Sequence, residues 1–116
     1  MGLIDMSWTE KLADTRTGLR ALNAAIPDTA RGFGALSKAA RDGGALDLKT
    51  KELVALAIAI ADRCEPCIML HVDALRKTGA SREELADVLG MCIQMGGGPS
   101  MMYAAKALEC WDELAS

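Results

Sequence analysis

The stretch that decides the fold is KELVALAIAIADRCEPCIMLH, residues 51–71. It begins with an apolar run over residues 53–61 and continues into two cysteines three positions apart and the chain's only histidine. An apolar run of this kind, rich in helix-forming residues, predicts a helix that is buried on all sides. The short connection near residues 61–64 predicts that the following helix folds back antiparallel to it. The stretch therefore predicts a helix hairpin at the centre of the fold.

The segments on either side also have helical patterns. Ser7 with Glu10 and Ser81 with Glu84 form capping-box patterns, and Asp47 can cap the helix before the cysteines. We expect six helices, over roughly residues 7–26, 28–41, 48–62, 64–78, 81–95 and 99–114. Alternating β-branched runs of useful length are absent from the sequence. The fold class is therefore all-α, a bundle of about six helices around the central antiparallel hairpin.

The composition limits the domain count, the partners and the location. A chain of 116 residues, about half of them apolar, suits one domain over 1–116, and a domain this small would gain from forming an oligomer. Its net charge is −3 and it has no basic patch, so nucleic acid is not an expected partner. The longest apolar run is too short to span a bilayer, and the N-terminus lacks the features of a signal peptide. We expect a cytoplasmic protein that does not enter a membrane.

The hairpin places four reactive side chains in one line. Residues equidistant from the turn lie side by side, which brings Glu52 level with His71. On the second helix, Cys64, Cys67 and His71 are spaced i, i+3 and i+7, positions that share one face. We therefore expect the order Glu52, His71, Cys67, Cys64 along the hairpin.

This line supports thiol chemistry. Both cysteines fall in or beside the first turn of a helix, a position that lowers the pKa of a thiol. His71 can accept the proton of Cys67, and Glu52 can hold the imidazole in one tautomer. A neighbouring carboxylate would raise the pKa of a thiol, so we expect Glu65 to point to solvent.

A thiolate at Cys67 could attack a peroxide and become a sulfenic acid, which Cys64 could convert to a disulfide. The same pair could instead exchange with an external disulfide. Both activities need a reductant for the next cycle. Two alternatives are a zinc site made by these cysteines with His71 and Glu52, and a pair of small buried residues near a turn. Structural zinc usually takes paired ligand motifs from two segments, so we expect no metal, and no other cofactor.

The remaining sulfur-containing residues have simpler expected roles. Cys92 and Cys110 each lie singly on a helical stripe, which favours packing over chemistry. Four methionines flank the glycine-rich break at residues 96–98, where they could line an apolar entrance for an organic peroxide or form core or a subunit interface: Met91, Met95, Met101 and Met102.

The pattern E-x11-C-x2-C-x3-H, formed by Glu52, Cys64, Cys67 and His71, resembles the AhpD-like alkylhydroperoxidase family of the carboxymuconolactone decarboxylase superfamily. The surrounding sequence agrees, with KTKELVALAIAIADRC before the motif, GASREELADVL after it and MGGGPSMMYAAKAL beyond. The resemblance extends over roughly residues 20–114.

The resemblance implies an AhpD-like helical fold that assembles as homo-oligomers, trimers or hexamers. It implies a thiol-dependent peroxidase or disulfide reductase with an antioxidant role. Cys67 would react with an organic hydroperoxide or disulfide substrate, Cys64 would form the disulfide and meet the reductant, and Glu52 with His71 would relay protons. The reductant would be a lipoylated or thioredoxin-like protein. In the best-studied branch a histidine precedes the second cysteine, and here that position is Pro66, a departure from the family pattern.

Two other functions remain alternatives. True carboxymuconolactone decarboxylases share the fold and generally lack the cysteine pair, so a lyase of that type is one. A non-enzymatic helical oligomer is the other.

Overall fold

The structure is a computed structural model that describes residues 6–116. The first residues of the chain, on which the expected absence of a signal peptide partly rests, lie outside this range. The helices are α1 (Trp8–Ala25), α2 (Pro27–Arg41), α3 (Leu48–Ala61), α4 (Glu65–Lys77), α5 (Arg82–Gly96) and α6 (Gly98–Ala115). Residues 6–116 contain no strand, which confirms the predicted all-α class. Over the same range, no helix is long and apolar enough to cross a membrane.

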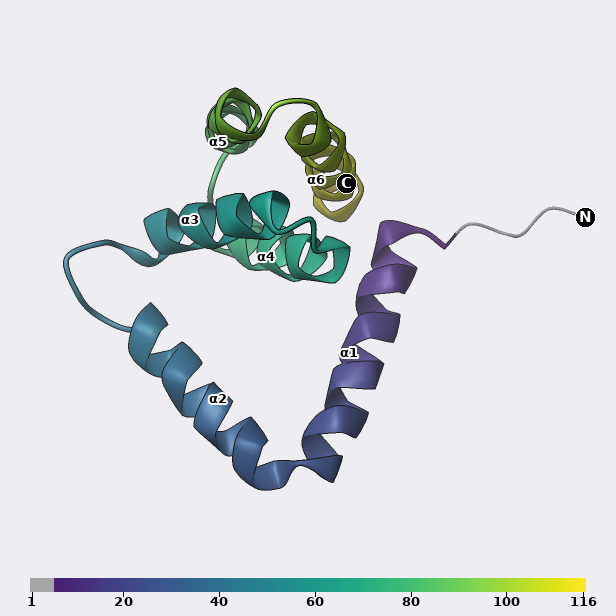
Figure 1. Ribbon diagram of the computed structural model, residues 1–116, viewed down its shortest axis with the longest axis vertical. Coiled ribbons are helices and arrows are strands. Elements are labelled where there is room, and N and C mark those ends of the chain that lie inside the picture. The colour runs from purple at the N-terminus through teal and green to yellow at the C-terminus, as the bar shows by residue number, and fades with distance from the viewer. Residues whose placement is uncertain (1–5) are drawn as a thin grey trace, which may run out of the picture.

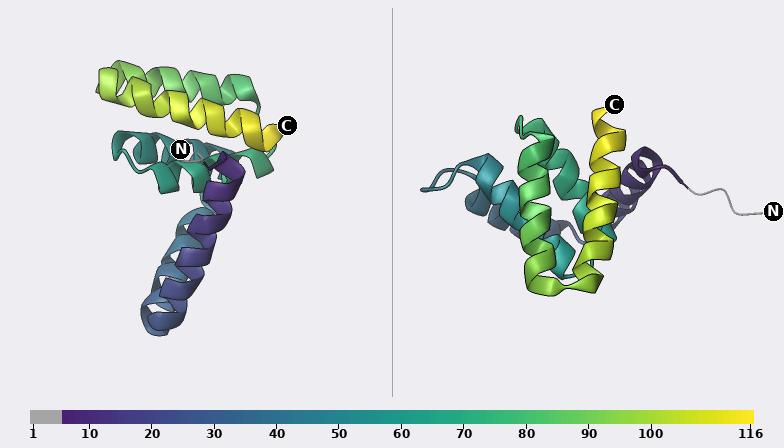
Figure 2. Two further views of the ribbon diagram at one scale, coloured as in Figure 1. Left: turned by 90° about the vertical axis from the view of Figure 1, so that its right-hand side faces the viewer. Right: turned by 90° about the horizontal axis from the view of Figure 1, so that it is seen from above.

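The helices α3 to α6 form two layers. The antiparallel pair α3 and α4 makes one layer, and α5 and α6 lie across it as the other (Figure 2). Side chains from both layers meet in the core, where burial of each large aliphatic side chain contributes about 1.5–3 kcal/mol. The largest fully buried side chains are Leu56, Ile60, Ile68, Val72, Leu75, Leu85 and Cys110. The predicted central hairpin is therefore present and supplies much of the core.

The prediction that α3 is buried on all sides is wrong. Val54 and Ile58 of α3 are about half exposed. They line an apolar groove of about 550 Å³ between α3 and α5, together with Met91 and Met95 of α5. The other helices of the chain cover only part of the circumference of α3, whereas the apolar side chains of α3 are distributed around the whole helix.

The first two helices form an arm that projects from these layers. The arm comprises residues 8–41, and its helices meet at their far ends and spread apart toward the rest of the chain (Figure 1). α1 packs through Trp8 and Leu12 on α4 and α6, whereas none of the residues of α2 is buried by the described chain. Phe33 and Leu36 of α2 are 68% and 64% exposed. An amphipathic helix without buried residues has no packing partner for its apolar face within this chain.

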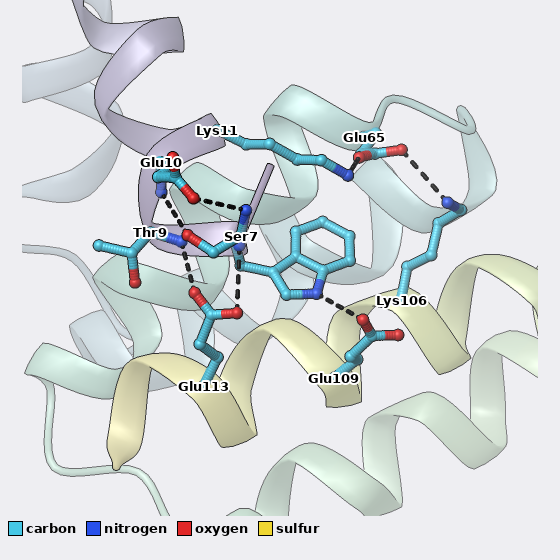
Figure 3. Close-up of polar contacts among 9 residues, drawn as sticks. Ser7, Thr9, Glu10, Lys11, Glu65, Lys106, Glu109 and Glu113 are labelled. Carbon is cyan, nitrogen blue, oxygen red and sulfur yellow. Dashed lines mark hydrogen bonds and ion pairs between the residues drawn. The ribbon is translucent and has the colours of Figure 1, made fainter. Parts of the chain in front are cut away.

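The N-terminus of α1 is fixed to α6 by hydrogen bonds. The carboxylate of Glu113 accepts bonds from the backbone N–H groups of Trp8 and Thr9, at 3.2 and 2.7 Å, and so caps α1 from another helix (Figure 3). The indole N–H of Trp8 donates to Glu109 at 2.9 Å. The predicted capping box of Ser7 and Glu10 is also formed.

A buried carboxylate ties the middle of α1 to α4. Asp73 is 3% exposed and forms ion pairs with Arg16 of α1 at 2.7 Å and with Arg76 and Lys77 of its own helix at 2.9 and 3.0 Å. Burial alone would raise the pKa of Asp73. The hydrogen bonds from Arg16, Lys77 and Arg76 outweigh that effect and lower the pKa from 3.8 to about 2.

This ion-pair cluster should make stability depend on acid. The pKa of Asp73 is lower in the folded than in the unfolded protein, so its stabilisation is present above about pH 4 and is lost as the pH falls toward 2. We expect Asp73→Asn to lower the free energy of unfolding by about 1–2 kcal/mol at neutral pH, because the exposed ends of its partners are screened by solvent. In urea denaturation the difference from wild type should shrink as the pH is lowered from about 5. A difference that stays constant with pH would contradict this role.

Candidate redox site

The cysteine pair is positioned by the start of α4. Cys64 is the N-cap residue, and its Sγ accepts a hydrogen bond from the backbone N–H of Cys67 at 3.3 Å. Pro66 lies in the first turn, where its missing N–H has no helical partner to lose. The chain enters this turn through Arg63, whose φ of 55° is in the left-handed region. The sequence prediction that both cysteines fall at the N-terminal end of the helix is confirmed.

Cys64 and Cys67 are joined by a disulfide, with their Cα atoms 5.2 Å apart. Both residues are half-buried, at the end of the α3–α4 hairpin. The two sulfur atoms are therefore within bonding reach of each other, and the chain can hold the pair in its oxidised form.

The hairpin brings Glu52 to His71, as its register predicts. Oε2 of Glu52 lies 2.8 Å from Nδ1 of His71, across 19 positions of sequence. The glutamate is 2% exposed, whereas the imidazole is about one-third exposed. His71 follows Cys67 by one helical turn on the same face of α4. The Glu52–His71 contact is observed directly, and the proximity of His71 to Cys67 follows from their helical spacing.

The structure adds Arg41 to this group, a residue that the sequence analysis did not identify. Its Nε lies 3.1 Å from Oε1 of Glu52, so the two carboxylate oxygens contact different partners. Arg41 is the last residue of α2, and the arm therefore reaches the site at its C-terminal end. The one signal in the sequence is general: a buried glutamate needs a positive partner, and the sequence does not say which of the basic residues supplies it.

Glu65, between the cysteines, does not point freely to solvent as predicted. Its carboxylate pairs with Lys11 of α1 at 3.1 Å and with Lys106 of α6 at 3.3 Å (Figure 3). Burial acts to raise the pKa of Glu65, but the hydrogen bonds from Lys11 and Lys106 outweigh it and lower the pKa. The negative charge beside the cysteines is thus offset by two ammonium groups, which also bind the start of α4 to α1 and α6.

The other two cysteines are free thiols in apolar surroundings. Cys110 is fully buried, and burial raises its pKa to about 12. Cys92 is half-buried beside the apolar groove, and burial raises its pKa as well. Neither favours a thiolate at neutral pH. Within residues 6–116, no group of three or more histidine, cysteine, aspartate or glutamate side chains is placed to hold a metal ion.

Comparison with known proteins places this arrangement in a family. The sequence profile of the carboxymuconolactone decarboxylase family matches residues 27–109, which include all of α3, α4 and α5. The chain belongs to the carboxymuconolactone decarboxylase family. The resemblance inferred from the Glu52, Cys64, Cys67 and His71 pattern is thereby confirmed at the level of the superfamily.

Solved members of the carboxymuconolactone decarboxylase family have the same fold. The apo crystal structure of a family protein from Legionella pneumophila is 46% identical, with a TM-score of 0.90 over 94% of this chain and 97% of the other. A family protein from Thermotoga maritima, described with a possible part in an antioxidative response, is 31% identical with a TM-score of 0.78 over 88% of this chain and 90% of the other. An uncharacterised protein of Cupriavidus necator is 39% identical over 90% of this chain and 92% of its own length.

Proposed function

We propose that this protein is a thiol-dependent alkylhydroperoxidase of the AhpD-like type. One observation carries the proposal: a Cys64–Cys67 disulfide lies at the start of α4, on the helix whose His71 is held by the buried Glu52. A dithiol pair beside an imidazole with an orienting carboxylate is the arrangement that an activated thiol nucleophile needs. The Thermotoga maritima relative, described with a possible part in an antioxidative response, supports the same class of activity.

The proposed cycle has three steps. His71 takes the proton of Cys67, and the thiolate attacks the peroxide, so that the O–O bond breaks and Cys67 becomes a sulfenic acid. The leaving alkoxide takes the proton from His71 and departs as the alcohol. The Cys64 thiol then displaces hydroxide from that sulfur, which forms the disulfide and releases water. A dithiol reductant, of the lipoylated or thioredoxin-like class, finally reduces the disulfide and is itself oxidised. The disulfide in the structure corresponds to the end of the second step.

The direct test is consumption of cumene hydroperoxide by the purified protein with dihydrolipoamide as the electron donor. We expect turnover that is proportional to protein concentration and is prevented by prior alkylation of the reduced protein. Absence of turnover with dihydrolipoamide, with thioredoxin and with dithiothreitol would refute the proposed peroxidase activity.

We propose further that the protein works as a homo-oligomer in which the arm of one copy packs on a second copy. The arm has an exposed apolar face on α2, and the groove between α3 and α5 offers an apolar acceptor. The part of the chain that contains the arm and the remainder have opposite net charges, because residues 6–46 hold six basic and four acidic side chains, whereas residues 47–116 hold seven basic and eleven acidic ones. A second copy of this chain therefore supplies both an apolar surface and an opposite charge.

The arm can be tested by changing its apolar face. We expect the double variant Phe33→Asp, Leu36→Asp to sediment as a monomer at concentrations where the wild type is an oligomer, because two buried contacts become charged. Both side chains are exposed in the single chain, so helical circular dichroism should not change. Ala86→Asp, on the exposed surface of α5, is the matched control and should leave the oligomer intact. A wild-type protein that sediments as a monomer would contradict the proposed assembly.

A further inference from the structure

The buried carboxylate of Glu52 contacts residues of two other helices. Its Oε1 lies 3.1 Å from Nε of Arg41 in α2, and its Oε2 lies 2.8 Å from Nδ1 of His71 in α4. The side chain of Glu52 is 3% exposed, so water cannot replace either partner to any large extent. The hydrogen bonds and ion pairs of this carboxyl group therefore depend on both neighbours.

An arginine beside a buried glutamate determines what the histidine can do. The guanidinium is always charged, so it balances an ionised carboxylate, and an ionised carboxylate only accepts hydrogen bonds. The atom that faces Oε2 must then be a donor, which places the imidazole proton on Nδ1 of His71. The lone pair of a neutral ring is left on Nε2, where it is available to take the proton of Cys67.

We propose that Arg41 is a positioning residue that fixes the tautomer of His71 through Glu52. The effect of this role on catalysis rests on the proposed thiol chemistry, but the tautomer itself can be observed without any reaction. Without Arg41, the buried carboxylate would lose its counter-charge, and an unpaired buried charge tends to neutralise by binding a proton. A protonated Glu52 can donate to Nδ1, which moves the ring proton to Nε2 and removes the lone pair that Nε2 would offer to the proton of Cys67.

The placement of Arg41 depends in turn on how the arm is held. The ammonium group of Lys51 binds three carbonyl oxygens at and just beyond the C-terminal end of α2, those of Ala40, Arg41 and Gly43, at 2.9, 3.4 and 2.6 Å. Because α2 buries no side chain, this clamp and the Arg41–Glu52 ion pair locate the end of the helix in place of apolar packing. The position of the arm is therefore coupled to the histidine that serves the redox cysteines.

The histidine can be observed directly because it is the only one in the chain. A two-bond ¹H–¹⁵N spectrum of the reduced, ¹⁵N-labelled protein at about pH 8 contains a single imidazole and reports its tautomer. We expect wild type and Arg41→Lys to have the proton on Nδ1, because lysine keeps the positive charge. Arg41→Gln should shift the population toward the Nε2–H tautomer and slow the alkylation of Cys67 by iodoacetamide by roughly 10-fold or more.

Two controls separate this role from a general effect on the fold. Lys38→Gln removes a basic side chain of the same helix that pairs with Asp42 and not with Glu52, and should leave the tautomer and the alkylation rate unchanged. Lys51→Met releases the clamp while keeping Arg41, and should shift the tautomer in the same direction as Arg41→Gln. This second variant also decides the matter if Arg41→Gln does not fold.

The inference would be overturned if Arg41→Gln kept the Nδ1–H tautomer. If Arg41→Gln does not fold, an unchanged tautomer in Lys51→Met would overturn it. Failure of Arg41→Lys to keep the wild-type tautomer would also overturn it, since lysine keeps the positive charge that balances Glu52. Failure of the proposed function has a different signature, because a wild type that consumes no peroxide would still give the tautomer spectra that decide the role of Arg41.

Discussion

Cys67→Ser should abolish the catalytic consumption of organic hydroperoxide. A serine hydroxyl does not ionise at neutral pH and cannot form a sulfenic acid, so the step that breaks the O–O bond is lost. The measurement is the rate of loss of cumene hydroperoxide with dihydrolipoamide as the donor. Cys92→Ser makes the same atomic change at a half-buried free thiol of α5 that takes no part in the disulfide, and should keep the wild-type rate. Turnover at the wild-type rate in Cys67→Ser would refute the role given to Cys67.

Cys64→Ser distinguishes the two cysteines. With one equivalent of peroxide and no added thiol, this variant should undergo one oxidation event and gain one oxygen atom at Cys67, seen in its intact mass. It should then stop, because the partner that forms the disulfide is absent. If instead Cys67→Ser forms a stable sulfenic acid at Cys64, the roles of the two cysteines are reversed.

His71→Gln should slow peroxide reduction by roughly 10²-fold or more at neutral pH. Glutamine is close to histidine in size and can still contact Glu52, but it cannot accept the proton of Cys67. The deficit should become smaller above about pH 8.5, where an ordinary thiol ionises without a base. The measurement is the second-order rate constant for peroxide in wild type and variant across that range. An equal rate at neutral pH would remove His71 from the mechanism.

The contact between Glu52 and His71 could be predicted because it depends on local geometry alone. Two antiparallel helices joined by a short turn place residues at equal distances from that turn side by side, whatever surrounds them. The helix starts were predictable for the same reason. Ser7, Asp47 and Ser81 satisfy backbone groups within three residues of themselves, and all three caps are formed.

The contacts that the sequence did not reveal are those between segments far apart in the chain. Arg41 reaches Glu52 because the arm returns to the hairpin at the end of α2, and no pattern in residues 27–41 indicates that return. Lys11 and Lys106 pair with Glu65 because α1 and α6 meet beside the cysteines. The exposure of Val54 was missed because an apolar pattern around a whole helix does not say whether its own chain covers every side.

The number of fast-reacting thiols in the reduced wild-type protein, before and after one equivalent of cumene hydroperoxide, tests the central proposal most directly. Burial raises the pKa of both Cys92 and Cys110, so these thiols should react slowly and serve as an internal reference. We predict that two fast thiols are lost and that peptide mapping finds them joined as Cys64–Cys67. Fast thiols that survive the peroxide would contradict the redox function and favour a lyase or a non-enzymatic oligomer.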